Sequence, residues 1–381
     1  MVSKDKAGAG MKDDRIRLGL VGYGARGRWM FKLGTERFEG VEAAAVCDHN
    51  PAFLQEAAQE HPGVPLFGDF DTMLEGVRLD ALLVETPATL HAEFCSKALE
   101  RDIPVMSDVP CVDRAEEAQV LWDAQAQSKA IYMIGANPNM WAFVETAVDL
   151  KRKGLLGNPY YIEAEYIHDG RGLFAQTPWR AAYESIKYST HSLGPMLRLI
   201  EEDLAWVSCF DTGSHINHLE GQHDAMAALF RTDSGVVVRL LTSHVNNCPE
   251  EAHHYRVYGT KGYFERTPAY DGPNSARTLF YSDQFYGPRR YTQLPVAEMR
   301  PEYERDPRAA GHGGADFALF DRFFEAIRKG LPSPISLREG LRMSLPGIYA
   351  AQSARSGGAL TRIVYPWSED AHAARASEEN A

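Results

Sequence analysis

Along the first third of the chain, short apolar runs alternate with segments whose apolar residues recur at helical spacing. The apolar runs, each typical of a buried strand, cover Ile16–Val21, Val41–Asp48, Pro65–Phe67, Asp80–Pro87, Ile103–Met106 and Ala130–Ile134. One helical segment begins at Pro51, a second ends at Leu99, and a third covers Arg114–Gln127. Strands that alternate with helices in this way predict βαβ units, in which parallel strands share one sheet.

After Asn137 the pattern changes to longer segments that alternate between apolar and polar positions. A helix is expected over Trp141–Lys153, and strands over Tyr160–His168, Met226–Phe230, Val236–His244, Tyr255–Gly259 and Gly262–Glu265. Such alternation predicts an antiparallel sheet. Pro268–Tyr291 is rich in Gly, Pro, Tyr and Arg and is expected to be a loop, with helices to follow over Ala315–Lys329 and Leu337–Ser356.

These patterns predict an α/β domain over residues 15–137 and an α+β domain with a mainly antiparallel sheet over residues 138–367. The polar segments 1–14 and 368–381 are expected to be flexible tails. A chain of 381 residues is too long for one ordinary core, which agrees with two domains.

Composition narrows the class of partner. A net charge of −12 argues against nucleic acids and anionic membranes as partners. The N-terminus lacks the apolar core of a secretion signal, and no apolar run approaches 18 residues, so the expected location is the cytoplasm. The five cysteines are scattered without a CxxC pair, which favours free thiols in a reducing compartment.

The turn after the first strand carries a glycine motif that is typical of dinucleotide binding. Gly22 permits a tight turn, Gly24 lets a diphosphate approach the backbone, and Gly27 lets helix and strand pack closely. The second strand ends in Asp48 about 20 residues later, where a carboxylate meets the ribose hydroxyls and favours NAD over NADP. The residues expected to contact NAD in this Rossmann domain are Gly22, Tyr23, Gly24, Ala25, Arg26, Gly27 and Asp48.

The fourth strand ends at Thr86 and Pro87. Because ligands lie beyond the carboxyl ends of parallel strands, Thr86, Pro87 and the nearby His91 are expected at the nicotinamide end of the cofactor.

Taken together, Gly22–Gly27, Thr86-Pro87 with His91, Asp108-Val109-Pro110 and Thr190-His191 resemble the Gfo/Idh/MocA oxidoreductases. The resemblance implies a Rossmann domain followed by an open sheet with helices on one face. It also implies a sugar or cyclitol bound between that sheet and the nicotinamide, and a homo-oligomer paired through the open face. The family's Glu-Lys-Pro signature is replaced by Asp108-Val109-Pro110. Asp108 is therefore expected either to bind the nicotinamide ribose or to cap a helix, and the usual proton-handling lysine is absent.

Two further stretches, Glu165–Asp169 and Tyr188–Pro195, look like the NAD-dependent glycosidase branch, of the α-N-acetylgalactosaminidase type. The branch's Tyr-x-His and Tyr-x-x-His pairs fall on Tyr166 with His168 and on Tyr188 with His191. Gly311–Asp316 resembles the branch as well, although a glycine turn before a helix explains it equally. Met133–Asn137 lacks the acidic residue of the N-acetylgalactosaminidase pattern, so the resemblance does not specify that sugar.

The resemblance implies redox-neutral glycoside cleavage: oxidation at C3, elimination across C1 and C2, addition of water, and reduction. We expect His191 to be the principal acid or base, because imidazole titrates near neutral pH, with Tyr188, Tyr166 and His168 around it. The alternatives are a conventional sugar or cyclitol dehydrogenase in which His191 carries the proton, and a non-catalytic NAD-bound sensor.

Substrate contacts are expected in the loop between the two motifs, where Arg171, Trp179 and Lys187 lie near Arg180. The tryptophan suits stacking on a sugar, and the cations suit hydroxyls or an anionic substituent, although a solvated loop is nearly as good an explanation. His215, His218 and His223 with Asp224 lack metal-ligand spacing and are interpreted as a polar loop, with no metal expected. His253 and His254 are expected at the surface or rim of the sheet.

Overall fold

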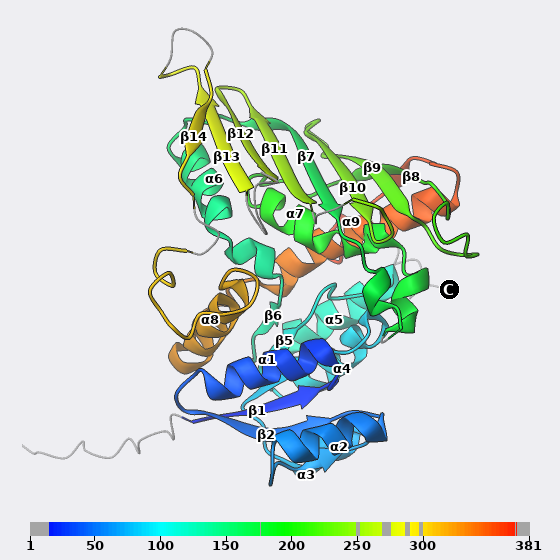
Figure 1. The fold of residues 1–381 in the computed structure, drawn as a ribbon, viewed down its shortest axis with the longest axis vertical. Coiled ribbons are helices and arrows are strands. Elements are labelled where there is room, and N and C mark those ends of the chain that lie inside the picture. The colour runs from blue at the N-terminus through cyan, green and yellow to red at the C-terminus, as the bar shows by residue number, and fades with distance from the viewer. Residues whose placement is uncertain are drawn as a thin grey trace, which may run out of the picture.

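The computed structural model describes residues 15–175, 177–248, 252–268, 276–285, 290–296, 300–369 and 371, arranged around two sheets (Figure 1). The first is a parallel six-stranded sheet in the order β3-β2-β1-β4-β5-β6. Its strands are β1 (Ile16–Val21), β2 (Val41–Cys47), β3 (Leu66–Phe67), β4 (Ala81–Val84), β5 (Val105–Ser107) and β6 (Tyr132–Ile134). This is the strand order of the Rossmann fold, so the predicted fold class of the first domain is confirmed.

Five helices connect these strands: α1 (Ala25–Glu36), α2 (Pro51–Glu60), α3 (Phe70–Gly76), α4 (His91–Leu99) and α5 (Ala115–Gln127). The strands are apolar because helices cover both faces of the sheet, and all four residues of β4 are buried. The strand order reverses between β1 and β4, and a dinucleotide binds at such a point.

The second sheet has nine strands in the order β14-β13-β12-β11-β7-β10-β9-β8-β15, and all its neighbouring pairs are antiparallel except β7 with β10. The strands are β7 (Pro159–Ile167), β8 (Trp206–Asp211), β9 (Ala225–Arg231), β10 (Val237–Ser243), β11 (Ala252–Gly259), β12 (Gly262–Pro268), β13 (Ala276–Ser282), β14 (Thr292–Leu294) and β15 (Thr361–Arg362). The predicted open, mainly antiparallel sheet is therefore confirmed.

Helices α6 (Ala142–Arg152), α7 (Thr190–Leu197) and α9 (Leu337–Arg355) lie along the face of this sheet that is turned toward the Rossmann domain, and α8 (Ala315–Lys329) lies beside α1 (Figure 1). Short 3₁₀ turns η1 to η5 cover Ala88–Leu90, Asn137–Met140, Arg171–Leu173, Pro178–Ala182 and Ser185–Tyr188. The expected domain boundary at residue 137 falls at the start of η2.

The two domains share an apolar interface. Phe38, which follows α1, stacks on Phe317 of α8 with ring centroids 4.6 Å apart and also contacts Phe320 and Phe324. Farther along, the amide of Ile134 in β6 donates to the carbonyl of Ile335 before α9 at 3.1 Å. These contacts hold the Rossmann domain against α8 and against the segment that precedes α9.

One expected loop is wrong in part: β13 lies inside Pro268–Tyr291. Its residues alternate between buried and less buried positions, with Thr278, Phe280 and Ser282 buried. The flanking glycines and prolines obscured a pattern that only pairing with β12 stabilises. Residues 269–275 and 286–289 of that loop lie outside the described residues. So do both expected tails, apart from Ser368, Glu369 and Ala371.

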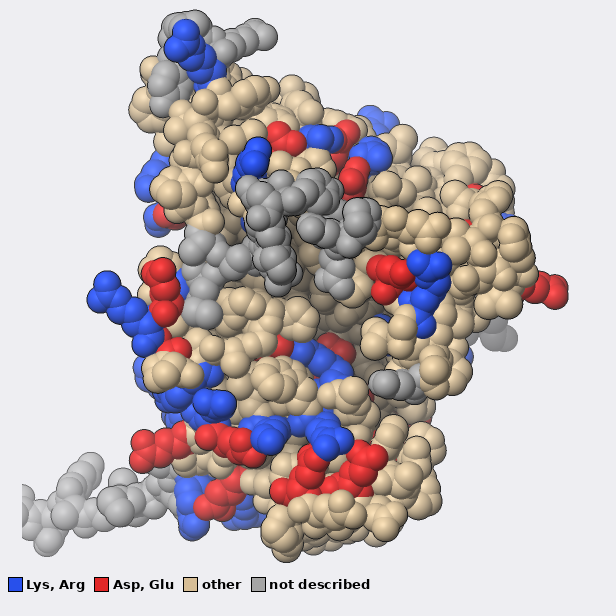
Figure 2. Space-filling model, in the orientation of Figure 1, with Lys and Arg blue, Asp and Glu red and all other residues tan. Residues whose placement is uncertain are grey.

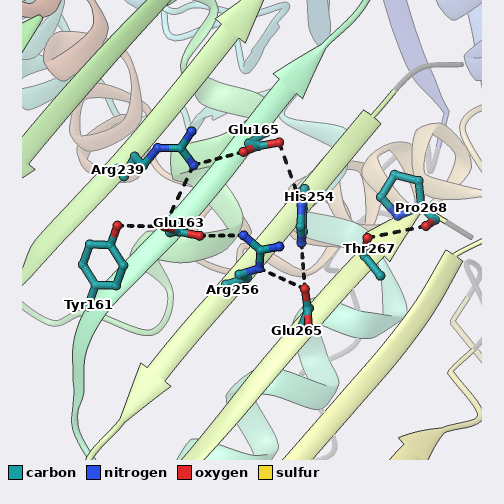
Figure 3. A network of polar contacts seen from close by, with 9 residues as sticks. All are labelled: Tyr161, Glu163, Glu165, Arg239, His254, Arg256, Glu265, Thr267 and Pro268. Carbon is teal, nitrogen blue, oxygen red and sulfur yellow. Dashed lines mark hydrogen bonds and ion pairs between the residues drawn. The ribbon is translucent and has the colours of Figure 1, made fainter. Parts of the chain in front are cut away.

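The outer face of the second sheet carries a network of charged side chains that joins four strands (Figure 3). Its members are Glu163, Glu165, Arg239, His254, Arg256 and Glu265, with ion pairs of 2.8 to 3.0 Å from Arg256 to Glu163, from Arg239 to Glu165 and from His254 to Glu265. Successive strand residues point to opposite faces, so Tyr166 of β7 faces inward while Glu163 and Glu165 face outward.

The molecular surface mixes acidic and basic side chains. On the face shown in Figure 2 the two signs are interspersed. Among the ion pairs at the surface, Arg28 of α1 pairs with Glu56 and Glu60 of α2. Within the described part of the chain, every helix is too short or too polar to cross a membrane.

Candidate active site

The turn from β1 into α1 requires glycine at two positions. Gly22 has φ +95°, and a Cβ there would press on the carbonyl of Glu85. A Cβ on Gly27 would overlap the carbonyl oxygen of Gly22. A Cβ on Gly24, in contrast, would meet no described atom within 4 Å. The backbone before α1 is thus open to a ligand, as a diphosphate at a helix N-terminus needs.

Asp48 lies beside this turn at the end of β2. It is 7% exposed, and its carboxylate accepts the amide of Tyr23 at 2.7 Å and that of Asn50 at 2.8 Å. The Tyr23 ring is buried, and its hydroxyl donates to Glu60 at 2.9 Å, so Tyr23 faces the predicted cofactor through its backbone alone. The carboxylate keeps lone pairs for ribose hydroxyls, which fits NAD.

His91 lies underneath the expected nicotinamide site and is only 1% exposed. Its Nδ1 lies 2.6 Å from the carbonyl oxygen of Pro110, and its Nε2 lies 2.7 Å from that of Thr86. The imidazole therefore holds together the two turns that carry Thr86-Pro87 and Asp108. Val109, between Asp108 and Pro110, is buried in the core. A lysine at this position would have reached the site.

Arg26 in the first turn of α1 makes a bidentate pair with Asp316 of α8, with both N–O distances 2.9 Å. The carboxylate of Asp316 also accepts Trp29 Nε1 at 3.2 Å, Asn137 Nδ2 at 3.1 Å and His312 Nδ1 at 2.9 Å. Burial raises the pKa of Asp316, but the hydrogen bonds from His312 and Arg26 outweigh it and hold that pKa well below its usual range. This group, the Asp316 hub, joins the cofactor turn to the second domain.

Glu85 lies between the glycine turn and Asp108, and sequence reasoning missed it. Its side chain is 2% exposed, and its Oε2 has no hydrogen-bond partner among the described residues, with Arg26 Nε 4.0 Å away. Burial, with a smaller contribution from Asp108, raises the pKa of Glu85 well above its ordinary value. An acidic residue at the end of an apolar strand was the one available signal.

The two predicted Tyr/His pairs meet on the inner face of the second sheet. Tyr166 of β7 stacks on His168, with ring centroids 5.5 Å apart, and lies edge-on to His191 of α7 at 5.5 Å. The Tyr188 hydroxyl lies 3.5 Å from His191 Nε2. The Tyr255 hydroxyl donates to the His191 carbonyl at 2.8 Å and anchors α7 on the sheet. The structure thus brings all four predicted catalytic side chains together.

Two more histidines complete this cluster. His253 of β11 is the cross-strand partner of Tyr166, and their rings lie 4.9 Å apart; His244, just after β10, lies 5.9 Å from Tyr166. His253 had been expected at the surface or rim with His254, but it faces the cluster while His254 joins the outer network. The strand register decides this, because paired residues share a face.

Burial lowers the pKa of His191 well below its ordinary value, and the charges of His253 and His312 add to the effect. The expected imidazole of ordinary pKa is therefore wrong for the uncomplexed enzyme: His191 is neutral. The pKa of Tyr188 is raised by burial, so its hydroxyl keeps its proton. A neutral imidazole beside a hydroxyl donor is ready to accept a proton from a substrate.

The buried histidines predict a loss of stability in mild acid. Burial, helped by Arg180, lowers the pKa of His244 from 6.5 to about 3, and His191 shifts the same way. Each contributes its full stability above pH 6.5, and loses it as pH falls toward the folded pKa, because the unfolded chain binds the proton first. We expect the free energy of unfolding to fall by at most about 1.4 kcal/mol per pH unit for each histidine.

Urea unfolding at intervals between pH 7 and 5 measures this slope, above the range in which carboxylates of ordinary pKa titrate. His244→Gln should flatten the slope by the share of one histidine, whereas His215→Gln, at an exposed position, should leave it unchanged. An equal slope in wild type and His244→Gln would contradict the assignment.

In the predicted substrate loop, two cationic side chains are held in ion pairs, and a third is stacked on a tryptophan. Arg171 is paired with Asp169 and with the carbonyl of Asn246 at 2.7 Å, and Lys187 with Asp113 at 3.1 Å. Trp179 is 36% exposed, and the Arg180 guanidinium lies over its ring at 4.6 Å. The charge of Arg180 lowers the pKa of His244 further and partly opposes the rise that burial causes in the pKa of Tyr188, so this stacked pair borders the cluster.

The histidines of the Asp211–Asp224 connection lie apart from this site. Asp224 accepts the amides of His215 and Ile216, and His223 pairs with Asp211 at 3.1 Å. Over the described residues, no three His, Cys, Asp or Glu side chains gather in a way that would hold a metal ion.

These features define a dinucleotide-binding enzyme of two domains, with a Tyr/His cluster facing the end of the cofactor turn. Two family models match the chain: the oxidoreductase family with an NAD-binding Rossmann fold over residues 16–136, and the GFO/IDH/MocA C-terminal domain over residues 144–265. The chain belongs to the GFO/IDH/MocA family, and it is an enzyme whose cofactor is NAD, as predicted.

Similar proteins fall into two groups. A glycosyl hydrolase family 109 protein of Saccharopolyspora erythraea is 25% identical, covering 91% of this chain and 82% of its own; the alpha-N-acetylgalactosaminidase of Shewanella oneidensis is 23% identical, covering 90% and 83%. Among solved structures, levoglucosan dehydrogenase with NADH has a TM-score of 0.76 at 17% identity, covering 92% and 100%. Apo scyllo-inositol dehydrogenase of Lactobacillus casei has a TM-score of 0.73 at 18% identity, and the match covers 92% of this chain and 99% of that protein. The structural matches show the fold.

Proposed function

We propose that this enzyme hydrolyses a glycosidic bond of a small carbohydrate by a redox-neutral route that uses NAD. The observation that carries the proposal is the cluster of His168, His191, His244 and His253 around Tyr166 and Tyr188, in a family member whose signature lysine is replaced by buried Val109. Relatives named as family 109 glycosidases support it.

The residues fit NAD along the glycine turn. The open backbone at Gly24 and the amides at the start of α1 would hold the diphosphate, and Asp48 the adenosine ribose. Thr86, Pro87 and Asp108, at the carboxyl ends of β4 and β5, would border the nicotinamide. NAD held there would supply a reversible hydride acceptor for the sugar.

The side chains of the cluster supply proton transfers. Oxidation at C3 makes the C2 proton acidic, and neutral His191 would remove it, since its lowered pKa keeps it in the basic form. The Tyr188 hydroxyl, 3.5 Å from His191 Nε2, would steady the imidazole or donate to the sugar oxygen. Tyr166 and His168 would share the remaining proton transfers, and Trp179 with Arg180 would pack on the sugar face.

A conventional sugar or cyclitol dehydrogenase is the second candidate. The likeness in fold to levoglucosan and scyllo-inositol dehydrogenases favours it. In that reaction His191 would take the proton of the oxidised hydroxyl in place of the missing lysine, and NADH would be released as product.

One experiment separates the two. The enzyme is incubated in D₂O with nitrophenyl glycosides and with free sugars, and both absorbance near 340 nm and aglycone release are followed. Aglycone release without net NADH, with deuterium at C2 of the product, is the expected result. Stoichiometric growth of NADH on free sugars, without aglycone release, would establish the dehydrogenase instead.

We also propose that the enzyme is a homo-oligomer that pairs through the outer face of the second sheet. The charged network there lies only partly exposed, with Glu163 and Glu265 at 17% and 15%, and it offers both signs to a second copy. Light scattering of the purified enzyme measures the mass; a monomer at micromolar concentration would contradict this proposal.

A further inference from the structure

The acidic side chain of Glu85 lies at the carboxyl end of β4, against the glycine turn between β1 and α1. The Glu85 amide donates to the carbonyl of Val21 at 2.9 Å, and a Cβ on Gly27 would lie 3.1 Å from the Glu85 Cβ. On the other side, the amide of Asp108 donates to the carbonyl of Val84 at 2.9 Å. A dinucleotide binds where the strand order reverses in this way, so Glu85 packs against the backbone that would hold the diphosphate.

The carboxyl group of Glu85 is buried without a hydrogen bond to its Oε2 from the part of the chain that the structure describes. The side chain is 2% exposed, and Arg26 Nε, at 4.0 Å from Oε2, is beyond hydrogen-bond distance. A buried carboxylate that lacks a partner is unfavourable, whereas the neutral acid costs far less. The geometry therefore favours the protonated form, and the raised pKa of Glu85 agrees with it.

The positive charge of Arg26 is already neutralised by Asp316. Both terminal nitrogens of Arg26 lie 2.9 Å from an oxygen of Asp316, whose lowered pKa keeps it ionised. His312 pairs with the same carboxylate, but its side chain is 53% exposed, so solvent screens its charge. Burial raises the pKa of Tyr188, the phenol that faces Glu85 from η5, so it stays neutral. With Asp108 nearby, an ionised Glu85 would add an excess negative charge beneath the turn.

We propose that the cofactor turn binds NAD tightly only while Glu85 carries a proton. The diphosphate of NAD is negatively charged, and a neutral Glu85 leaves the amides and the positive dipole end of α1 unopposed in holding it. The affinity for NAD then falls as pH rises through the pKa of Glu85, because the ionised form must take up a proton before it binds. NADH lacks the positive charge of the oxidised ring, so its affinity depends on this proton at least as strongly.

The test replaces Glu85 with glutamine, which has nearly the shape of the neutral acid and cannot ionise. Fluorescence titration with NADH gives the Kd of each protein at intervals from pH 6.5 to 9. We expect the wild-type Kd to rise at least about tenfold over this range, and that of Glu85→Gln to stay within about threefold. At pH 6.5 the two Kd values should agree within about threefold, because both side chains are neutral there.

Glu36→Gln is the matched control. Glu36 ends α1, and its side chain is 53% exposed, so the substitution removes the same charge far from the turn and should keep the wild-type dependence on pH. A wild-type Kd as constant with pH as that of Glu85→Gln would overturn the proposal. So would a Glu85→Gln enzyme that binds NADH about tenfold or more weakly at pH 6.5, because the cofactor would then need the carboxylate itself.

Urea unfolding gives a second readout that does not depend on the cofactor. An acid whose pKa is raised by folding loses stability as pH rises above the pKa of the unfolded chain, because the unfolded chain releases the proton first. Glutamine has no such loss, so Glu85→Gln should be at least as stable as wild type at pH 9. A variant that is less stable than wild type at pH 9 would overturn the proposal, since the ionised carboxylate would then be favourable in the folded protein.

Discussion

Replacing His191 with asparagine is expected to lower turnover by about 10² to 10⁴-fold, the usual contribution of an acid or base in contact with substrate. The reason is local: His191 is 8% exposed, neutral through burial and next to the Tyr188 hydroxyl. Asparagine keeps a polar side chain of similar reach but cannot take a proton at neutral pH. Steady-state kinetics on the active glycoside, with titration of NAD by fluorescence, makes the measurement.

The affinity for NAD should stay within about threefold, because the glycine turn and Asp48 are untouched. His223→Asn is a matched control, since His223 pairs with Asp211 away from the site. Retained turnover in His191→Asn would remove this residue from the mechanism and leave Tyr166, Tyr188 and His168 as the groups to test.

Replacing Asp316 with alanine is expected to lower the free energy of unfolding by about 3 to 5 kcal/mol, the range for breaking a buried ion pair on one side. Removal of its carboxylate leaves the Arg26 guanidinium, Trp29 Nε1 and Asn137 Nδ2 without their acceptor. Because Arg26 lies in the first turn of α1 and Asp316 in the first turn of α8, the loss also loosens the cofactor turn from the second domain. Urea unfolding followed by tryptophan fluorescence gives the value.

Asp149→Ala supplies the comparison. Asp149 pairs with Arg152 at 2.9 Å, but both side chains are at least half exposed, so its removal should cost about 0 to 1 kcal/mol. If Asp316→Ala cost no more than Asp149→Ala, the hub would be dispensable for stability.

Much of the Rossmann domain could be predicted because its signals are local. The apolar runs match β1 to β6 to within a few residues, and Gly22 and Gly27 sit where a Cβ has no room. Such signals survive in a single sequence, since sterics and burial act over a few neighbouring residues. The motif at Tyr188–Pro195 likewise led to His191 by resemblance.

Other parts of the fold and of the site could not be predicted, because they depend on pairing between segments that are distant in the sequence. β13 was taken for a loop because its alternation becomes a strand only when β12 and β14 lie beside it. His253 was expected at the rim, although its register opposite Tyr166 turns it inward. The protonation state of Glu85 could not be predicted from the sequence, because its raised pKa arises from burial and from Asp108, which lies at the end of a different strand.

The sequence by itself determined the glycine turn, the acid after β2 and the change from helical to strand periodicity, because each is set by residues close along the chain. Only the tertiary structure decided that Arg26 meets Asp316 across 290 positions, and that six Tyr and His rings from the ends of three strands, from η5 and from α7 share one site. Charge, burial and hydrogen bonding act through space, so the protonation states on which the chemistry depends exist only once the two sheets have packed together.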